Sequence, residues 1–501
     1  MSENEINSPD NSRKKKKTDD IESFMKTYYE CFQPILGLCS ISDRPVITYI
    51  FDNMQFTRFL ERKDFQHLII KCLLHYGHAG EHVFQLSEKV INILISEAIS
   101  SGKKLKLERR IGNHNGSIYI NMGNSKGEFV GLTPNGWNVC NRSPVHFLSS
   151  PKDLSLPDPV DCELKEFLHL WKSLFNFKDD NSSYLALGFA VKAMLPNTGA
   201  NPILVLEGVQ GSGKTTVSVT LKKLIDPTLP AIFSPPKTEK DFLIMANTTH
   251  LPVIDNSSGF SAEMSDVLCR ASTGGGISLR VLYETDEERV YNFCKPIIVN
   301  GIEELTDRAD FVERALILYL KPLGFESRIS ETQYWNNFEL VYPKLMGGLL
   351  KLLVHVLKVL PNIQTNRLVR MTEYNRVGLA LDKAFNFEEN YFSEVLQQHQ
   401  DQKLSSIFDN DMFCQLIHET LERNGDIEGS ATQLMKKIYR NKGEKVPNHI
   451  LPRDPRRFKG KLQRLKTVLE ANGIEWGEIA RTSDSRGLFI RLMDESQNNI
   501  E

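Results

Sequence analysis

A glycine-rich segment with one lysine and two threonines carries the clearest chemistry in this sequence. Gly208-Val209-Gln210-Gly211-Ser212-Gly213-Lys214-Thr215-Thr216 has the pattern G-x-x-x-x-G-K-[ST]. An apolar run, residues 203–206, precedes it, and a stretch with helical character follows to residue 224. Glycines let the backbone point several N–H groups at phosphate oxygens, and the start of the helix adds its positive end. The sequence therefore predicts a phosphate-binding loop between a buried strand and a helix.

Two side chains of this segment are expected to contact the nucleotide and its metal ion. Lys214 would reach the β- and γ-phosphates, and the Thr215 hydroxyl would take one position on Mg²⁺. The predicted cofactors are therefore ATP and Mg²⁺. The residues predicted to bind them are Gly208, Gly211, Ser212, Gly213, Lys214, Thr215 and Thr216.

A second apolar run ends in a carboxylate. Residues 251–254 read as a buried strand, and Asp255 and Asn256 follow it. After a phosphate loop, such an Asp is expected to share Mg²⁺ with the loop threonine. Asn256 can orient the attacking water but cannot accept its proton. The general base is therefore unassigned, with Asp255, Glu263 and a residue of a neighbouring subunit as the candidates.

A third strand, residues 296–299, ends in Asn300, and an arginine opens a fourth. Asn300 is predicted to hold the attacking water, although Asn before Gly301 is also a favourable turn pair. Arg314 stands before the apolar run 315–318, where a guanidinium could reach the nucleotide of a neighbouring subunit. Arg308 is the alternative, and a surface salt bridge is the alternative role for either arginine. An arginine that acts in this way requires a ring-closing assembly.

The C-terminal part is strongly basic. Residues 431–470 hold twelve Lys or Arg and three acidic residues, a local balance of +9 in a chain whose net charge is −2. A capping box at Ser430 predicts one helix, and Asp454 with Pro455 predicts the start of a second that runs to Gly473. A hairpin around residues 482–486 follows. Helix, helix and hairpin is a winged-helix pattern, and a surplus of cations favours a polyanionic partner.

DNA is the partner that this basic segment favours, although a solvated helix in a protein–protein module shows the same pattern. Phosphate contacts of this kind depend on salt and little on base sequence. The residues predicted to contact DNA are Arg280, Arg456, Arg457, Lys459, Lys461 and Arg464.

The N-terminal third divides by composition. Residues 1–20 are polar and basic and are predicted to be a disordered tail. Residues 21–100 read as mostly helical, with apolar stretches at 65–70 and 90–95, whereas 103–148 show the short runs of β-hairpins. Residues 151–159 read as a linker, and a helical pair is expected at 161–195.

Composition excludes several classes of protein. The apolar run 345–360 is interrupted by Lys351, His355 and Lys358, so it predicts a buried helix rather than a membrane span. The eight cysteines form no C-x-x-C pair, which argues against zinc knuckles and disulfide scaffolds and fits a cytoplasmic location. No secretory signal is apparent at the N-terminus.

The ordered motifs resemble those of the primase–helicase-type ATPases of bacteriophages and integrative elements, in the AAA+ branch near superfamily 3 helicases. The resemblance covers most of residues 60–495. It rests on the phosphate loop and on the segments 116–120, 134–137, 268–276, 280–283, 299–302 and 370–374. It implies that Lys214, Thr215, Asp255, Asn300 and Arg314 have nucleotide roles, in a homo-hexamer that threads single-stranded DNA. The Asp-Asn pair at 255–256 looks normal for this branch.

The residue patterns and the resemblance together predict an α/β fold in five parts. These are the tail at 1–20, an α+β domain at 21–155, an AAA+ P-loop core at 156–325, a helical lid at 326–400 and a winged-helix domain at 401–495. Longer relatives carry a primase module, but the first 160 residues show neither a paired-carboxylate polymerase site nor a zinc site. A separate primase or initiator is therefore an expected partner, and no membrane is.

One departure leaves three functions open. Superfamily 3 helicases grip DNA with a hairpin, which here would span residues 277–293, but its expected tip at 284–288 is mostly acidic. Acidic side chains repel phosphates, so Arg280, Tyr283 and Arg289 on the flanks are the candidates for a grip. A helicase is the first reading, and an ATPase that binds DNA and switches assembly without unwinding is the second. A small-molecule kinase is the third and is disfavoured by the basic domain.

Overall fold

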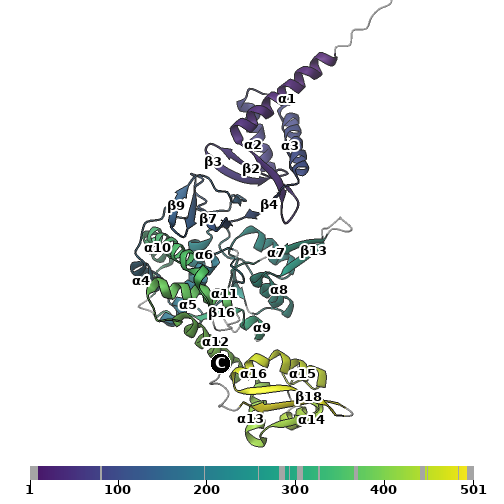
Figure 1. Cartoon of the computed structure of the whole chain (residues 1–501), viewed down its shortest axis with the longest axis vertical. Helices are drawn as coiled ribbons and strands as arrows, with labels where there is room; N and C mark the ends of the chain where they lie inside the picture. The colour runs from purple at the N-terminus through teal and green to yellow at the C-terminus, as the bar shows by residue number, and fades with distance from the viewer. Residues whose placement is uncertain are drawn as a thin grey trace, which may run out of the picture.

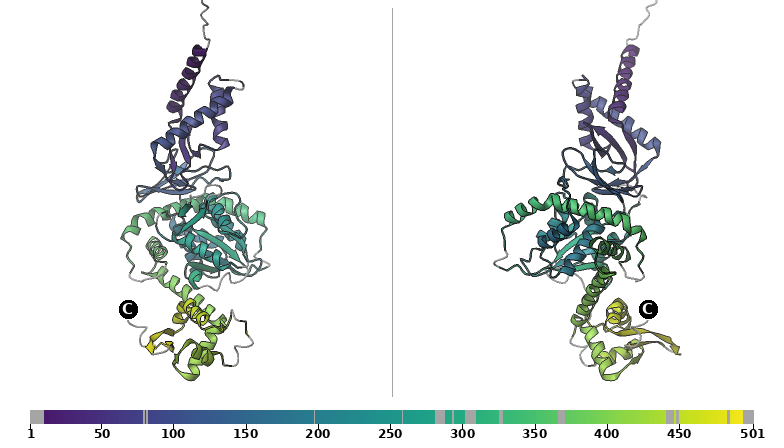
Figure 2. Two further views of the ribbon diagram at one scale, coloured as in Figure 1. Left: turned by 90° about the vertical axis from the view of Figure 1, so that its right-hand side faces the viewer. Right: turned by 60° about the vertical axis from the view of Figure 1, so that its left-hand side comes forward.

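The chain forms an elongated molecule of three parts that follow one another along its long axis (Figures 1 and 2). We describe it from a computed structural model. The residues described are 10–78, 80, 82–196, 198–257, 259–280, 288–292, 294–301, 309–324, 328–365, 371–440, 446–447, 450–482 and 485–493.

The N-terminal part packs three helices against a small sheet with the strand order β3-β2-β1-β4. Aromatic and aliphatic side chains such as Tyr28, Phe65 and Leu94 fill the space between them. The elements are α1 (Asp10–Phe32), β1 (Ile35–Cys39), β2 (Pro45–Phe51), β3 (Met54–Phe59), α2 (Lys63–His75), α3 (His82–Ser101) and β4 (Lys104–Leu105).

The structure differs from two predictions for this part. Helix α1 begins at Asp10, so residues 10–20 are not a disordered tail, and residues 1–9 lie outside the described part of the chain. Strands β1 to β3 interrupt the region predicted to be mostly helical. Strand β2 is rich in β-branched and aromatic residues, which pack well on a pleated surface. The apolar stretches at 65–70 and 90–95 do lie in helices, α2 and α3.

A second sheet confirms the predicted hairpins. Strands β6 (Ile111–His114), β7 (Ser117–Asn121), β8 (Phe129–Thr133) and β9 (Gly136–Cys140) form an antiparallel meander, and β5 (Leu107–Glu108) pairs with β10 (His146–Phe147). Alternate side chains, Ile118, Ile120 and Leu132 among them, are buried in the same core as the central part. This sheet therefore packs onto the central part rather than forming a separate core.

The predicted linker is a packed segment. Leu154 N donates to Pro227 O at 2.9 Å, and Leu156 is buried. The helical pair expected after it is present as α4 (Leu164–Leu174) and α5 (Asp180–Ala193). Asp179 caps α5 by accepting from Ser182 N, which explains where that helix begins.

A parallel sheet of four strands forms the centre of the α/β part, in the order β12-β15-β11-β16. The strands are β11 (Ile203–Glu207), β12 (Val253–Ser257), β15 (Ile297–Gly301) and β16 (Ala315–Tyr319). They are buried on both faces, and alternate residues of β11 join two different cores. Near-continuous apolar runs are what such a doubly covered parallel sheet requires.

Helices cover both faces of this sheet and a hairpin extends from it (Figure 1). The helices between its strands are α6 (Lys214–Ile225), α7 (Glu239–Thr248), α8 (Ala262–Thr273) and α9 (Ala309–Val312). Strands β13 (Gly276–Arg280) and β14 (Glu288–Asn292) form the expected antiparallel hairpin, in which Arg280 pairs with Glu288. The tip at 281–287, with Tyr283, lies outside the described residues, as do the side chains of Arg280 and Arg289.

Long helices complete the central part. They are α10 (Glu331–Val359), the 3₁₀ turn η1 (Leu360–Asn362), α11 (Thr372–Phe385) and α12 (Tyr391–Asn410). Among the described residues, one helical stretch, Glu331–Asn362, is long and apolar enough to cross a membrane by length and composition alone. Of its most apolar window, 56% is buried inside the protein, where Leu345, Leu349 and Leu353 belong to the main core.

The C-terminal part contains four helices and a three-stranded sheet of order β17-β19-β18. Its elements are α13 (Met412–Asn424), β17 (Ile427–Gly429), α14 (Ala431–Tyr439), α15 (Pro455–Arg464), α16 (Lys466–Ala471), β18 (Ile474–Thr482) and β19 (Ser485–Leu492). The capping box at Ser430 and the cap by Asp454 are confirmed. The second helix, predicted to run to Gly473, instead breaks at Leu465 into α15 and α16.

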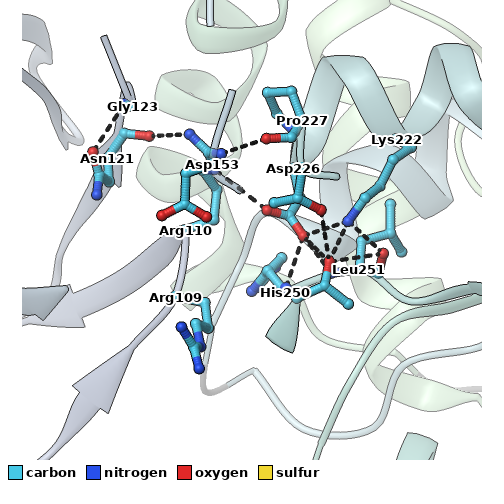
Figure 3. A network of polar contacts seen from close by, with 12 residues as sticks. Arg109, Arg110, Asn121, Gly123, Asp153, Lys222, Asp226, Pro227, His250 and Leu251 are labelled. Carbon is cyan, nitrogen blue, oxygen red and sulfur yellow. Dashed lines mark hydrogen bonds and ion pairs between the residues drawn. The ribbon is translucent and has the colours of Figure 1, made fainter. Parts of the chain in front are cut away.

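A buried carboxylate, Asp226, joins the N-terminal and central parts (Figure 3). It follows α6 directly and is 1% exposed. Lys222 Nζ donates to it at 2.7 Å from one turn earlier, and Arg110 Nε donates at 3.3 Å from the segment before β6. Burial alone would raise the pKa of Asp226, but the charges of Lys222 and Arg110 outweigh burial and hold it far below its usual value.

A threonine hydroxyl and several backbone groups complete the hydrogen bonds around Asp226 and Arg110. Thr249 Oγ1, His250 N and Leu251 N donate to Asp226 Oδ2 at 2.5, 2.7 and 2.9 Å. Arg110 Nη2 and Nη1 also donate to Pro227 O and Asn121 O at 2.6 and 2.9 Å. One carboxylate therefore connects the end of α6, the start of β12 and the meander sheet.

We expect Asp226→Asn to lower the free energy of unfolding by about 3–5 kcal/mol, because it leaves Lys222 and Arg110 buried without a counter-charge. Urea unfolding followed by circular dichroism measures the change. Asp158→Asn is the matched control, since Asp158 is 75% exposed and 3.6 Å from Lys126, a pair worth less than about 1 kcal/mol. Equal stability of the two variants would contradict the role given to Asp226.

Stability should also fall in acid through His250. Burial, and then the charge of Lys295, lower the pKa of His250 to about 4, and the ring contacts Ala193 O at 2.8 Å. The unfolded chain takes up this proton near pH 6.5, so the contribution is complete above that pH and is lost as the pH falls toward 4. Urea titrations should show His250→Asn losing up to roughly 3 kcal/mol less than the wild type between these pH values. An identical loss in both proteins would exclude His250 as the titrating group.

Candidate nucleotide site

The predicted phosphate loop lies where β11 ends and α6 begins. Gly211 and Gly213 have φ of +78° and +84°, a conformation that side chains disfavour, and Lys214 is the first helical residue. A Cβ on Gly208 would lie 2.7 Å from Ser212 Oγ and 3.2 Å from Leu320 O. Glycine is therefore required at these positions for two different reasons: backbone conformation at Gly211 and Gly213, and close packing at Gly208.

The Lys214 side chain lies over this loop. Its Nζ donates to Gly208 O at 2.6 Å and to Val209 O at 3.1 Å. Burial lowers the pKa of Lys214, and the nearby charge of Asp255 opposes that shift. The ammonium is thus held against two carbonyls of the loop, beside the place where a phosphate would bind.

Four polar side chains form a continuous chain next to the start of α6. Thr215 Oγ1 donates to Asp255 Oδ2 at 3.0 Å, and Asn300 Nδ2 donates to Asp255 Oδ1 at 2.9 Å. Ser218 Oγ donates to Asn300 Oδ1 at 2.6 Å, and Asn300 is 1% exposed. Three segments that are widely separated in sequence thus meet at the carboxyl end of the sheet.

The oxygen atoms of this group suit a hard cation. A hydroxyl and a carboxylate lie within one hydrogen bond of each other beside a phosphate loop, which is the donor set that Mg²⁺ takes in P-loop enzymes. No cluster of three or more His, Cys, Asp or Glu side chains occurs within the described residues. An ion here would therefore be held by few protein ligands, as Mg²⁺ commonly is when phosphates and water supply the rest.

Other predicted residues have less defined places. Thr216 follows Thr215 in the first turn of α6, and Ser212 is buried with an Oγ that has no hydrogen-bond partner among the described residues. Asn256 continues β12 after Asp255, but its side chain lies outside the described part. Glu263 is exposed in the first turn of α8. The general base is therefore still unassigned.

Sequence reasoning missed two residues at this loop. Asn176 Nδ2 donates to Ser212 O at 2.8 Å and to Lys321 O at 2.9 Å, so it ties the loop to the segment after β16. A Cβ on Gly211 would lie 3.6 Å from Arg328 Nη2, so this guanidinium lies beside the loop. Neither residue stands in a recognisable motif, and only their long-range contacts reveal them.

Helix α12 also reaches the strand that carries the loop. Lys403 Nζ lies 3.9 Å from Glu207 Oε2, and both side chains are 7% exposed. Lys403 also contacts the Tyr319 hydroxyl at 3.3 Å. Because Glu207 immediately precedes Gly208, this buried pair connects the long C-terminal helices to the phosphate loop.

Arg314 lies at the opposite edge of the sheet. Strands β16 and β11 are parallel, and Arg314 O accepts from Ile203 N at 2.9 Å at the start of β11, whereas the loop follows the end of that strand. Arg314 Nη1 donates to Asp310 O at 2.6 Å. It cannot reach the phosphate loop of its own chain. The alternative, Arg308, lies outside the described residues.

Some basic residues of the C-terminal part are exposed, whereas others are bound to partners within the protein. Arg456, Arg457 and Arg464 are exposed on α15. Lys459 pairs with Glu478. Lys461 is 8% exposed and donates to Asp411 and to Ile450 O, both at 2.9 Å, so its charge is used inside the domain. Lys461 therefore leaves the set of predicted DNA contacts.

Two family models of replication proteins match parts of this chain. Residues 168–397 match the family described as actinomycete integrative conjugative element replication protein. Residues 413–499 match the C-terminal domain of AICE RepA, which denotes the same kind of protein. The two matches follow the order of the central and C-terminal parts. No curated protein matches the sequence.

Solved structures resemble the chain only distantly. The apo C-terminal region of NrS-1 is 12% identical, with a TM-score of 0.40 over 94% of this chain and 98% of that one. JCV helicase bound to a small molecule is 15% identical, with a TM-score of 0.22 over 46% of this chain and 68% of that one. These scores are too low to support site assignments. By its family matches, the chain is similar to replication proteins of integrative conjugative elements.

Proposed function

We propose that this protein is an ATP-hydrolysing ring motor that translocates on or unwinds DNA, as the replicative helicase of a mobile element. The chain of hydrogen bonds from Thr215 through Asp255 and Asn300 to Ser218 carries the proposal. It places a metal-binding hydroxyl, a carboxylate and a water-orienting amide beside a phosphate loop. This combination serves hydrolysis of a nucleoside triphosphate rather than phosphate binding alone.

Each side chain has a separate task in this proposal. Lys214 binds the β- and γ-phosphates, and Thr215 and Asp255 hold the metal ion. Mg²⁺, when bound, neutralises charge that develops on the phosphoryl oxygens. Asn300 orients the attacking water. The water transfers its proton to Asp255, to Glu263 or to a group of a neighbouring subunit.

A ring follows from the position of Arg314. This arginine lies across the sheet from its own phosphate loop, and a partner's loop is the site that it would serve. Contacts between opposite edges of neighbouring copies are heterologous, and they close into rings when the rotation permits. We propose a homo-hexamer of AAA+ type, in which α10 to α12 form the lid and the Lys403–Glu207 pair links it to the loop.

The C-terminal part is the proposed DNA anchor. Its described elements follow the order of a winged helix: a helix, a short strand, three further helices, of which α15 and α16 are two halves of one broken helix, and a hairpin. Arg456, Arg457 and Arg464 project from α15 without an ion pair within the described residues, so they are available for backbone phosphates. Arg280, on the hairpin, stays a proposed contact within the ring. A separate primase or initiator and a cytoplasmic location complete the proposal.

A regulatory ATPase that binds DNA and switches its assembly without unwinding is the second candidate. The acidic residues at 284–288, between β13 and β14, favour it because they repel a phosphate backbone. Strand separation distinguishes the two functions. A protein that hydrolyses ATP but does not separate strands at any salt concentration would be the regulatory ATPase.

Steady-state ATP hydrolysis by the purified full chain, with and without single-stranded DNA, tests the motor. We expect DNA to stimulate hydrolysis and Lys214→Ala to lower it about 10²-fold or more, because a preorganised charge at the phosphates is lost. Lys240→Ala, an exposed lysine of α7, is the matched control and should leave the rate unchanged. A slow rate that neither DNA nor Lys214→Ala alters would overturn the proposal.

Arg314→Ala should preserve ATP binding and lower hydrolysis by roughly 10³-fold or more. Arg314→Lys should restore little, because an ammonium lacks the planar fork of the guanidinium. Mixing Arg314→Ala with Asp255→Asn should recover part of the activity, since one subunit supplies the arginine and its neighbour supplies the carboxylate. No recovery in rings shown by native mass spectrometry to be mixed would place Arg314 outside the neighbour's site.

Replacing Arg456, Arg457 and Arg464 by Ala should weaken duplex binding and flatten its dependence on salt. Each lost phosphate contact lowers the slope of log K against log salt by about 0.9. Fluorescence anisotropy at several salt concentrations measures that slope. Replacing the exposed Lys63, Lys71 and Lys89 by Ala removes the same charge from the N-terminal part and is the control. Equal effects of the two triple variants would show that net charge alone matters.

A further inference from the structure

A second cavity lies far from the phosphate loop, between the N-terminal and central parts. Its volume is about 1000 Å³, at the upper end of small-molecule sites. Residues before β6 and after β1 form one wall, and residues that precede β11, β12 and β15 form the other. Because the phosphate loop is at the carboxyl ends of these strands, this cavity is at the opposite edge of the sheet.

Two cations from the two parts line this cavity. Arg109 comes from the N-terminal side and Lys295 from the segment before β15. Arg109 Nε donates to Asn247 O at 2.7 Å and Nη1 contacts Leu148 O at 3.4 Å, while Lys295 Nζ donates to Thr249 O at 3.0 Å. Neither side chain forms an ion pair with any described residue. In Figure 3 the Arg109 guanidinium points away from Asp226.

Capping of α7 accounts for only part of this arrangement. The carbonyls of residues 247 and 249 lie at the end of that helix, where cations are favourable. Together with the contact to Leu148 O, these bonds use one donor of Lys295 and two guanidinium nitrogens of Arg109, so further N–H groups of both side chains have no partner among the described residues. A neutral amide would satisfy the same carbonyls without the cost of burying a charge. Neither charge is therefore neutralised by an ion pair within the described residues.

The surrounding charges leave a positive excess. Arg110 and Lys222 already share Asp226, Glu108 is paired with Lys106 at 2.8 Å, and Asp153 acts on both Arg109 and Arg110, so the cations still outnumber the carboxylates. Burial lowers the pKa of Lys295 to about 8, although the charge of Glu108 opposes this shift, and burial lowers the pKa of Arg109, although the charge of Asp153 opposes it. An anionic group placed between the two side chains would offset the cost of burying both positive charges.

The rest of the lining is largely apolar and includes Ile41, Phe59, Leu107, Leu148, Leu195 and Pro296. Arg44 lies at the rim, with its guanidinium 4.2 Å from the centre of the Phe59 ring. Apolar walls with two convergent cations suit a ligand that has a ring or chain at one end and a phosphate at the other. We propose that this cavity binds a phosphorylated small molecule of nucleotide size, with the phosphate between Arg109 and Lys295.

This second ligand would be independent of ATP hydrolysis. Its site contains no residue of the phosphate loop, and nucleoside monophosphates are suitable probes because they lack the β- and γ-phosphates that Lys214 would bind. The test uses the full chain with Lys214→Ala, which removes that contact. A fluorescent derivative of AMP is titrated against this protein, and unlabelled AMP, GMP, CMP and UMP compete.

We expect saturable binding of one probe per chain, weakened at least tenfold by Arg109→Gln and by Lys295→Gln. Lys152→Gln, an exposed lysine outside the cavity, should bind as the parent does. No saturable binding, or binding that neither cavity variant alters, would overturn the proposal. Binding of a fluorescent oligothymidylate that depends on both cations, without monophosphate binding, would also overturn it and make the cavity part of a path for a strand.

Cys294 gives a second measurement that needs no cavity substitution. Its thiol is exposed and lines the cavity, whereas Cys31 is exposed elsewhere. Bound monophosphate should slow maleimide labelling of Cys294 and leave that of Cys31 unchanged, as followed by peptide mass spectrometry. Equal labelling of Cys294 with and without saturating monophosphate would contradict the proposed site even if a cavity variant failed to fold.

Discussion

The geometry of the nucleotide site depends on a carboxylate at the far end of the same helix. Asp226 follows α6 and holds Leu251 N, so it fixes the end of α6 against the start of β12. The helix and the strand run in opposite directions, and their other ends carry Thr215 and Asp255, which meet at 3.0 Å. A rigid helix and a rigid strand joined at one end keep their register at the other. The buried charges of Lys222 and Arg110 are therefore part of the scaffold that positions the oxygens of Thr215 and Asp255.

Much of the candidate site could be predicted from sequence because its residues lie in short continuous segments with recognisable patterns. The phosphate loop is one continuous motif, and Asp255 and Asn300 each end an apolar run, so parallel strands bring them to one edge. Asn176, Arg328 and Asp226 could not be found in this way, since each acts through contacts with segments distant in sequence. The same limit explains Lys461: its helix is basic throughout, and only the fold reveals that Asp411 neutralises it.

The errors in the fold have a similar origin. Strands β1 to β3 lie between two strong helical patterns, and short half-buried strands carry a weaker periodic signal than amphipathic helices. The break at Leu465 follows no glycine or proline; it lets α15 and α16 both turn apolar side chains, Leu462 and Leu469 among them, into one core. Such a bend is set by packing in the whole domain, whereas the sequence shows only an apolar stripe at helical spacing, Phe458, Leu462, Leu465 and Leu469, which predicts a single helix.

The two ends of the sheet would connect hydrolysis to assembly in the proposed ring. The phosphate loop lies at the carboxyl end of the strands and Arg314 at the amino end, so each copy would supply the loop of one site and the arginine of its neighbour's. Next to Arg314, Glu313 Oε1 accepts from Thr467 Oγ1 at 2.5 Å, and Thr467 belongs to α16 of the basic domain. If Arg314 shifts when it contacts a neighbour's nucleotide, the shift would therefore move Glu313 and its partner Thr467 in the domain proposed to bind DNA. The short path from arginine to α16 gives a physical route by which the state of the nucleotide and the position of the basic helices constrain each other.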